Sequence, residues 1–297
     1  MKIIQSFWSK PSYKKKNVKV HDRNNGGWTD KKYNYFSWAL SCLQFRKYYD
    51  DVELITDEIG YEILIEKLKL PYTKVDVCLD KINHYHEDLW ALGKIYAYSI
   101  QNTPFIHADG DVFIFRKFEE SFENSPILAQ NIEIGYPVYK ETFKELQDHF
   151  TYIPEDILKY YNTFGEVNGV NMGIVGGNAT SFFKQYTEKA FEFIDKNTDY
   201  LSKINNIGLF NIIFEQTLLY SIAHKEGIPV KFYIDNINQG FDGICDVLGS
   251  SHQRSYLHAL GPFKTVNIIA VQIEDLLRRS YPEYYHNIIR LLKTHQI

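Results

Sequence analysis

The sequence predicts an α/β fold with a mixed, mostly parallel sheet that is flanked by helices. Two observations lead to this expectation. Short runs rich in β-branched residues alternate with helical stretches up to residue 115, an order typical of βαβ units. A length of 297 residues with 44% hydrophobic and 24% charged residues suits a globular chain of one large domain or two modest ones.

Each expected strand is short and rich in Val, Ile or Phe, and the first four are separated by stretches of helix length. The expected strands are residues 2–7, 52–56, 74–79, 105–115, 127–134, 169–177 and 228–234. The expected helices are residues 33–49, 57–70, 86–101, 154–164, 179–197, 210–227 and an amphipathic helix over about 273–294. Asp57 is expected to cap the start of the second helix, and Gly227 to end the sixth.

The chain shows no internal repeat, low-complexity linker or clear boundary. We therefore expect a single domain over residues 1–265 and a C-terminal helical appendage over residues 266–297. Apolar and basic residues alternate along that appendage, so peripheral contact with a membrane is one interpretation. Packing on the domain or on a dimer partner is the favoured one.

Charge and cysteine content narrow the class of protein. The net charge of -4 and an isoelectric point near 6.2 give no general attraction to nucleic acid or anionic lipid. No run approaches the roughly 18 apolar residues of a membrane span, and the first residues are typical of a strand and not of a signal peptide. Cys42, Cys78 and Cys245 form no ligand or disulfide pattern, so we expect free thiols in a cytoplasmic protein.

Two carboxylates stand one residue apart in the apolar run of residues 105–115. Asp109 and Asp111 flank Gly110, and alternate residues of a strand point to the same face, so the two side chains can converge. A divalent Mg²⁺ or Mn²⁺ would balance their charge, and such ions usually complete their coordination with substrate phosphates. On this motif alone, a solvated turn is the favoured alternative by about two to one.

A second motif lies near the end of the chain, in HALGPFK at residues 258–264. His258 suits Mn²⁺ better than Mg²⁺, Gly261 permits close approach of the backbone, and Lys264 offers a positive charge for phosphate. An Asp-Gly-Asp after an apolar strand, followed late by His-x-x-Gly-x-x-Lys, resembles the nucleotide-sugar glycosyltransferases of the GT-A fold. The resemblance is strongest to the retaining family eight, the glycogenin and galactosyltransferase-like enzymes.

Further positions match that family in the right order. Asn171 and Gly173 resemble its Asn-x-Gly near the donor sugar, and Glu215 with Gln216 resembles its acid-Gln pair, in which the family usually has Asp. Lys94 matches a basic position that often reaches the donor diphosphate. Each residue alone has an ordinary structural explanation, so their joint order carries the inference.

The resemblance implies a metal-dependent, hexosyltransferase-like enzyme that takes a sugar from a nucleoside diphosphate, with uridine diphosphate as the expected carrier. It implies that Asp109, Asp111 and His258 bind Mn²⁺ or Mg²⁺. In a retaining reaction Gln216 would lie beside the anomeric carbon, and in an inverting one Glu215 would be the candidate base. The acceptor and the oligomeric state stay open.

Two departures and two alternative functions remain. Thr265 and Val266 stand where the family often has Pro-Trp, and the first strand lacks the family's Asp-containing turn. Trp8, near the end of that strand, could stack on a base or lie in the core. A haloacid-dehalogenase-like phosphatase also uses Asp-x-Asp, but Phe113 replaces its usual Thr or Val and the motif is not on the first strand. An inactive nucleotide-sugar-binding module is the other alternative.

Overall fold

The computed structural model describes residues 1–13, 25–234 and 255–297. Cys245 lies outside the described residues. The chain divides into two compact units. Unit 1 comprises Met1–Glu87, Ala108–Glu119 and Ile237–Ile297, and unit 2 comprises Asp88–His107 and Glu120–Asn236. The expected boundary at residue 265 is not tested by this division and stays a prediction.

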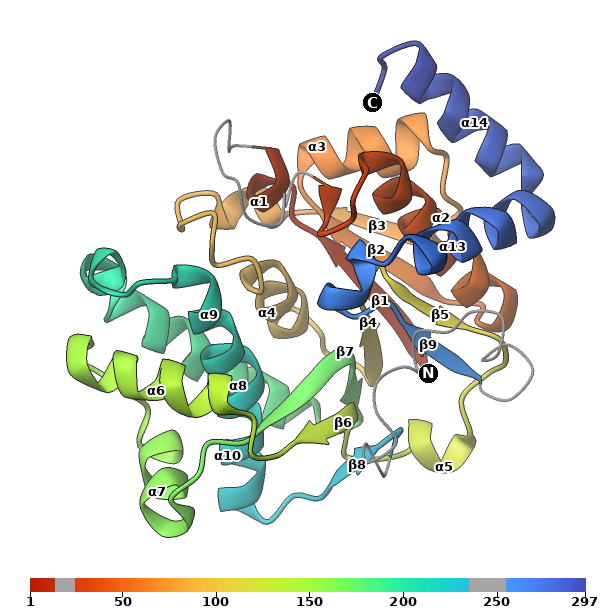
Figure 1. Cartoon of the computed structure of the whole chain (residues 1–297). Coiled ribbons are helices and arrows are strands. Elements are labelled where there is room, and N and C mark those ends of the chain that lie inside the picture. The colour runs from red at the N-terminus through yellow and green to blue at the C-terminus, as the bar shows by residue number, and fades with distance from the viewer. Residues whose placement is uncertain (14–24, 235–254) are drawn as a thin grey trace. The chain divides into compact units, whose positions relative to one another are not determined.

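The main sheet has seven strands in the order β3-β2-β1-β4-β7-β6-β8 (Figure 1). The strands are β1 Lys2–Phe7, β2 Val52–Thr56, β3 Lys74–Val77, β4 Phe105–Ala108, β6 Ile127–Glu133, β7 Gly169–Gly177 and β8 Val230–Phe232. β1 pairs with β2, β2 with β3 and β6 with β8 in parallel, whereas β6 and β7 are antiparallel. The predicted mixed α/β class with flanking helices is therefore confirmed.

Two short strands, β5 Val112–Ile114 and β9 Tyr256–His258, form a separate antiparallel pair in unit 1. The sequence instead predicted one strand over 105–115. The chain turns at Asp109, where the Val112 N–H donates to the Asp109 carbonyl at 3.1 Å. The two aspartates thus lie in a tight turn between strands, and a strand face is the wrong explanation for their convergence.

Helices of unit 1 include α1 Lys10–Tyr13, α2 Lys31–Tyr48, α3 Glu58–Tyr61, α13 Asn267–Ser280 and α14 Pro282–Lys293. Unit 1 also contains a π segment, Glu62–Lys67, and two 3₁₀ segments, Leu79–Ile82 and Gly261–Thr265. Asp57 caps α3 as predicted, because its carboxylate accepts from the Gly60 N–H at 2.8 Å. The expected single C-terminal helix is two helices, since Pro282 disfavours helical geometry at Tyr281.

Helices of unit 2 are α4 Leu92–Ser99, α5 Glu120–Glu123, α6 Pro137–His149, α7 Glu155–Phe164, α8 Thr180–Asp195, α9 Ile207–Asn211 and α10 Leu218–Glu226. A 3₁₀ segment spans Thr198–Lys203, and a π segment, Ile212–Thr217, joins α9 to α10. Gly227 ends α10 in the left-handed conformation, as predicted. Helix α6, which begins at Pro137, was not predicted from the sequence.

The central strands β4 and β7 lie in the hydrophobic core. Every residue of β4 and β7 is buried, which suits strands covered on both faces. β3, at the end of the strand order, is largely exposed. Cys42 and Cys78 are buried free thiols, as the cysteine spacing predicted.

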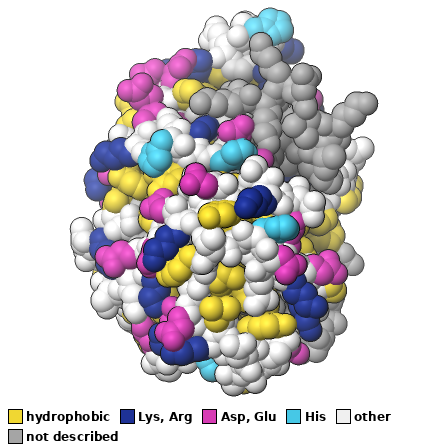
Figure 2. Space-filling model, turned by 90° about the vertical axis from the view of Figure 1, so that its left-hand side faces the viewer, with side chains coloured by type: hydrophobic (Ala, Val, Ile, Leu, Met, Phe, Trp, Pro, Cys, Tyr) yellow, Lys and Arg dark blue, Asp and Glu magenta, His cyan; other side chains and the backbone are white. Residues whose placement is uncertain are grey.

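The distribution of surface charge agrees with the small net charge of the sequence. On the face drawn in Figure 2, acidic and basic side chains are interspersed and neither sign forms a continuous field. Among the described residues, no helix combines the length and the apolar character required to cross a bilayer.

Candidate functional site

The Asp-Gly-Asp turn meets His258 through strand pairing. β5 and β9 place Val112 opposite His258, and the Ala259 N–H donates to the Asp111 carbonyl at 3.0 Å. As a result, one ligand atom from each of Asp109, Asp111 and His258 can lie within 4.8 Å of the others. The local reason is simple: the turn delivers both carboxylates to the end of β5 that faces the end of β9.

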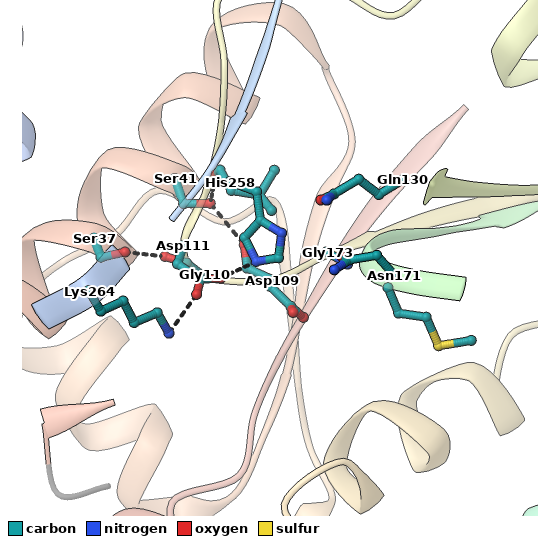
Figure 3. Close-up of polar contacts among 12 residues, drawn as sticks. Ser37, Ser41, Asp109, Gly110, Asp111, Gln130, Asn171, Gly173, His258 and Lys264 are labelled. Carbon is teal, nitrogen blue, oxygen red and sulfur yellow. Dashed lines mark hydrogen bonds and ion pairs between the residues drawn. The ribbon is translucent and has the colours of Figure 1, made fainter. Parts of the chain in front are cut away.

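Helix α2 holds the backbone of this turn. The Ser37 hydroxyl donates to the Gly110 carbonyl at 2.8 Å, and the Ser41 hydroxyl donates to the Val112 carbonyl at 2.6 Å (Figure 3). The Gln5 amide donates to Ser41 Oγ at 2.9 Å. Sequence reasoning missed these residues, although serines four apart on a helix share a face and are a usable signal.

Gly110 is required by the indole that lies against the turn. A Cβ atom at this position would stand 2.4 Å from Trp38 Cε2, closer than real carbon atoms approach. The close contact between α2 and the turn therefore depends on the absence of a side chain between the two aspartates.

Lys264 contacts Asp111 directly. Lys264 Nζ lies 2.6 Å from Asp111 Oδ2, and His258 Nε2 lies 3.5 Å from Asp111 Oδ1. Burial by itself would raise the pKa of Asp111, but the charges of Lys264 and His258 and their hydrogen bonds outweigh it. They hold the pKa of this carboxyl well below its usual range, so Asp111 is an anion at any physiological pH.

The donor set fits a divalent cation. Two carboxylates and one imidazole are oxygen and nitrogen ligands of the kind that suit Mn²⁺, and cation binding requires deprotonated ligands. The low pKa of Asp111 meets that requirement. The arrangement can therefore hold a cation, with Lys264 as a further positive charge beside it.

Gly261 lies in the turn Gly261–Thr265 that carries Lys264. A Cβ atom added at Gly261 would meet nothing within 4 Å. The glycine is thus not demanded by packing among the described residues, and its proposed role in close approach of a ligand stays a prediction.

In unit 2, the predicted acid-Gln pair lies on the π segment, a helix distortion that is frequent at functional sites. The Glu215 carboxylate is fully buried, and its Oε1 lies 2.9 Å from Lys94 Nζ. Lys94 Nζ also lies 3.5 Å from the Met172 carbonyl. Lys94 and Glu215 thus form one buried ion pair. The side chain of Glu215 has no exposed surface that an acceptor could reach.

A polar cluster surrounds Gln216 in the same unit. The Tyr139 hydroxyl contacts both the Gln216 side-chain oxygen and the carboxylate of Glu133. The Asn171 amide donates to Glu133 Oε1 at 2.9 Å, and its oxygen accepts from the Gly173 N–H at 3.1 Å. Glu133, at the end of β6, was not predicted as a site residue, because it belongs to no motif with a characteristic spacing.

The predicted site residues thus form two groups. Unit 1 brings together Asp109, Asp111, His258 and Lys264, with Gly261 on the same turn as Lys264. Unit 2 joins Lys94 to Glu215, Asn171 directly to Glu133, and Gln216 to Glu133 through Tyr139. Trp8 is a buried indole whose N–H donates to Asn83 at 2.7 Å, so in this structure it is a core residue.

The model of a protein family, described as a family of unknown function (DUF6734), matches residues 1–291 of the chain. The chain belongs to DUF6734. A search of curated proteins finds no match to this DUF6734 chain.

Solved structures with some likeness to this DUF6734 chain include two glycosyltransferases. Mouse xyloside xylosyltransferase 1 in its apo form has 12% sequence identity and a TM-score of 0.39, covering 86% of this chain and 96% of that one. Galactosyltransferase LgtC, in complex with donor and acceptor sugar analogues, has 11% identity and a TM-score of 0.41, covering 87% and 86%.

Proposed function

We propose that this protein is a glycosyltransferase of GT-A type that moves a sugar from a nucleoside diphosphate to an acceptor. The observation that carries the proposal is the convergence of Asp109, Asp111 and His258 from distant parts of the chain, with Lys264 in contact with Asp111. A carboxylate pair, with Asp109 half-buried and Asp111 largely buried, beside an imidazole and a lysine is suited to a divalent cation and a diphosphate together.

The residues of unit 1 act on the leaving group. During transfer, the bond between the anomeric carbon and the diphosphate oxygen breaks, a bond from the acceptor oxygen to that carbon forms, and the acceptor's proton passes to the leaving diphosphate, on which negative charge accumulates. Asp109, Asp111 and His258 would hold a cation, which would supply positive charge to that diphosphate. Lys264 adds a further charge and favours the transition state, in which the leaving group is most negative.

The residues of unit 2 are proposed to recognise the donor sugar. Glu133, Asn171 and Gln216 provide hydrogen-bond acceptors and donors for sugar hydroxyls, and Tyr139 fixes two of them in place. Lys94 neutralises Glu215 and orients the π segment that carries Gln216. With Glu215 fully buried, a retaining reaction that needs no strong base is favoured over an inverting one.

The proposal is tested by calorimetry with uridine diphosphate, with and without Mn²⁺. We expect binding to require Mn²⁺ in the wild type, because Lys264 alone does not balance the negative charges of Asp109, Asp111 and a diphosphate together. Asp111→Ala should lose that requirement together with most of the affinity. Asp275→Ala, which removes a partly exposed carboxylate of α13 that pairs with Arg278 and Arg279, is the control and should bind as the wild type does.

Two results would redirect the assignment. Equal affinity for uridine diphosphate with and without Mn²⁺ in the wild type would remove the cation from the proposal. A phosphoaspartate trapped at Asp109 would instead assign phosphatase chemistry. If turnover is found, proton NMR of the first-formed product gives the stereochemistry, and an inverted anomer would exclude the retaining mechanism.

A further inference from the structure

Lys264 is held by three groups that attract cations. Its Nζ lies 2.6 Å from Asp111 Oδ2 and 2.9 Å from the Gly26 carbonyl, and 5.8 Å from the centre of the Trp28 ring. The side chains of Lys264 and Asp111 are only 16% and 12% exposed. The ammonium group is therefore enclosed by an anion, a carbonyl and an aromatic face, and it neutralises the same carboxylate that belongs to the candidate cation site.

This position conflicts with a divalent cation at the same carboxylate. A cation bound by Asp111 would lie within a few ångströms of the Lys264 ammonium, at a largely buried location where like charges are poorly screened. The two carboxylates of the site, Asp109 and Asp111, carry two negative charges, whereas Lys264 and a divalent cation together carry three positive ones. A diphosphate resolves the conflict, because it brings negative charge for the lysine and for the cation.

We propose that Lys264 is the resident counter-ion of Asp111, and that a divalent cation binds tightly only when Lys264 exchanges Asp111 for a diphosphate. The proposal rests on the function proposed above and adds to it a thermodynamic coupling between cation and nucleotide. Such coupling is reciprocal: each ligand raises the affinity for the other by the same factor. The protein would thus avoid holding a cation in the absence of its donor.

The two possible roles of Lys264 predict different effects of its removal on cation binding. If Lys264 only contacts phosphate, its removal leaves the affinity for the cation alone unchanged. If Lys264 is the counter-ion of Asp111, its removal frees a buried carboxylate and raises that affinity. The nucleotide should then increase cation affinity much less than it does in the wild type.

The experiment measures Mn²⁺ binding by electron paramagnetic resonance of the free ion, with and without uridine diphosphate. Lys264→Met replaces the side chain with an apolar one of similar length, and we expect it to bind Mn²⁺ alone about tenfold more tightly than the wild type. Lys32→Met is the control, since it removes the same charge from an ion pair with Glu274 elsewhere in unit 1 and should leave Mn²⁺ affinity unchanged.

Unchanged or weaker Mn²⁺ binding by a folded Lys264→Met protein would overturn the inference. If circular dichroism shows that this variant does not fold, Lys264→Gln, which keeps a polar end group, is judged by the same two outcomes. The proposed function fails separately: equal binding of uridine diphosphate by the wild type with and without Mn²⁺ removes its cation, and a phosphoaspartate trapped at Asp109 replaces it with phosphatase chemistry.

Discussion

Gly110 is the residue on which the geometry of the Asp-Gly-Asp turn depends most directly. We expect Gly110→Ala to lower the free energy of unfolding by about 1–3 kcal/mol, because its Cβ would stand 2.4 Å from the Trp38 ring and the turn must shift. That shift should also weaken Mn²⁺-dependent binding of uridine diphosphate. Urea unfolding and calorimetry measure the two effects.

Gly261→Ala is the matched control for stability, since its Cβ meets nothing within 4 Å. We expect wild-type stability from it. If Gly110→Ala proves as stable as Gly261→Ala, the close contact with Trp38 is not what selects glycine. If Gly261→Ala loses only nucleotide binding, close approach of the ligand explains that glycine.

Among single residues, the sequence predicted those site residues that lie in a short motif of recognisable chemistry. Asp109, Asp111, His258 and Lys264 could be selected because two adjacent carboxylates need a positive partner. Glu133 could not be found, because its partners Tyr139 and Asn171 meet it only through folding and at no characteristic spacing.

Helix α2 holds the Asp-Gly-Asp turn through two serines, Ser37 and Ser41. We expect Ser37→Ala to weaken Mn²⁺ binding several-fold, because the Gly110 carbonyl loses its donor and the turn is no longer fixed; an unpaired buried group costs about 1–3 kcal/mol. Ser37→Thr should restore binding, since it keeps the hydroxyl.

The control for this element is Thr187→Val, which removes a buried hydroxyl that donates to a carbonyl within α8 of unit 2. It should lower stability to a similar degree and leave Mn²⁺ affinity unchanged. Equal loss of affinity in both variants would mean that lowered stability, and not positioning of the turn, is the cause.

Three helices of unit 2 meet at Asp156. This carboxylate on α7 lies 2.7 Å from Lys189 on α8 and 2.8 Å from Lys225 on α10, and it is 4% exposed. Burial raises the pKa of Asp156, but the hydrogen bonds and charges of the two lysines outweigh burial and lower it. The ionised form is thus the one that the folded state favours.

A lowered pKa in the folded state means that Asp156 stabilises the protein above the unfolded carboxyl pKa of about 3.9, and that this stabilisation is lost as the pH falls through the lower folded pKa. We expect Asp156→Asn to be less stable than the wild type at pH 7, with the difference shrinking towards pH 3. Glu155→Gln, at the exposed neighbour, should show little difference. A constant difference for Asp156→Asn over this pH range would exclude the ion pairs as its cause.

Elements were predicted well where periodicity and stop signals agree, as for α2, α8 and β7. Breaks inside an element were harder to place. Pro282 divides the last helix in two, and the turn at Asp109 divides an apolar run that reads as one strand. The π segment at Ile212–Thr217 has no sequence signal of its own, because the same residues would suit an ordinary α-helix.

For the molecule as a whole, the C-terminal helices are part of unit 1. α13 and α14 pack on α2 (Figure 1), with Tyr285 stacked on Phe36 at 5.3 Å between ring centres. Five large aliphatic residues of these helices are buried: Ile269, Ile273, Leu277, Ile288 and Leu291. Burial of each contributes about 1.5–3 kcal/mol, so their joint loss is large compared with the stability of a domain.

We therefore expect a chain that ends at Thr265 to be markedly less stable than the full chain, or to aggregate. A chain that ends at Thr294, which keeps both helices, is the control and should melt close to the full chain. Thermal unfolding followed by circular dichroism compares them. An unchanged melting temperature after loss of residues 266–297 would show that these helices contribute little to the stability of unit 1.

The pairing of β5 with β9 has a consequence for synthesis of the chain. About 150 residues separate Asp111 from His258, so at about 5–20 residues per second the ribosome needs roughly 7 to 30 seconds to pass from one to the other. During that time β5 has no partner from β9, and Asp111 has neither lysine nor imidazole beside it. The cation site is therefore among the last features that a nascent chain acquires, and a prematurely terminated one lacks it altogether.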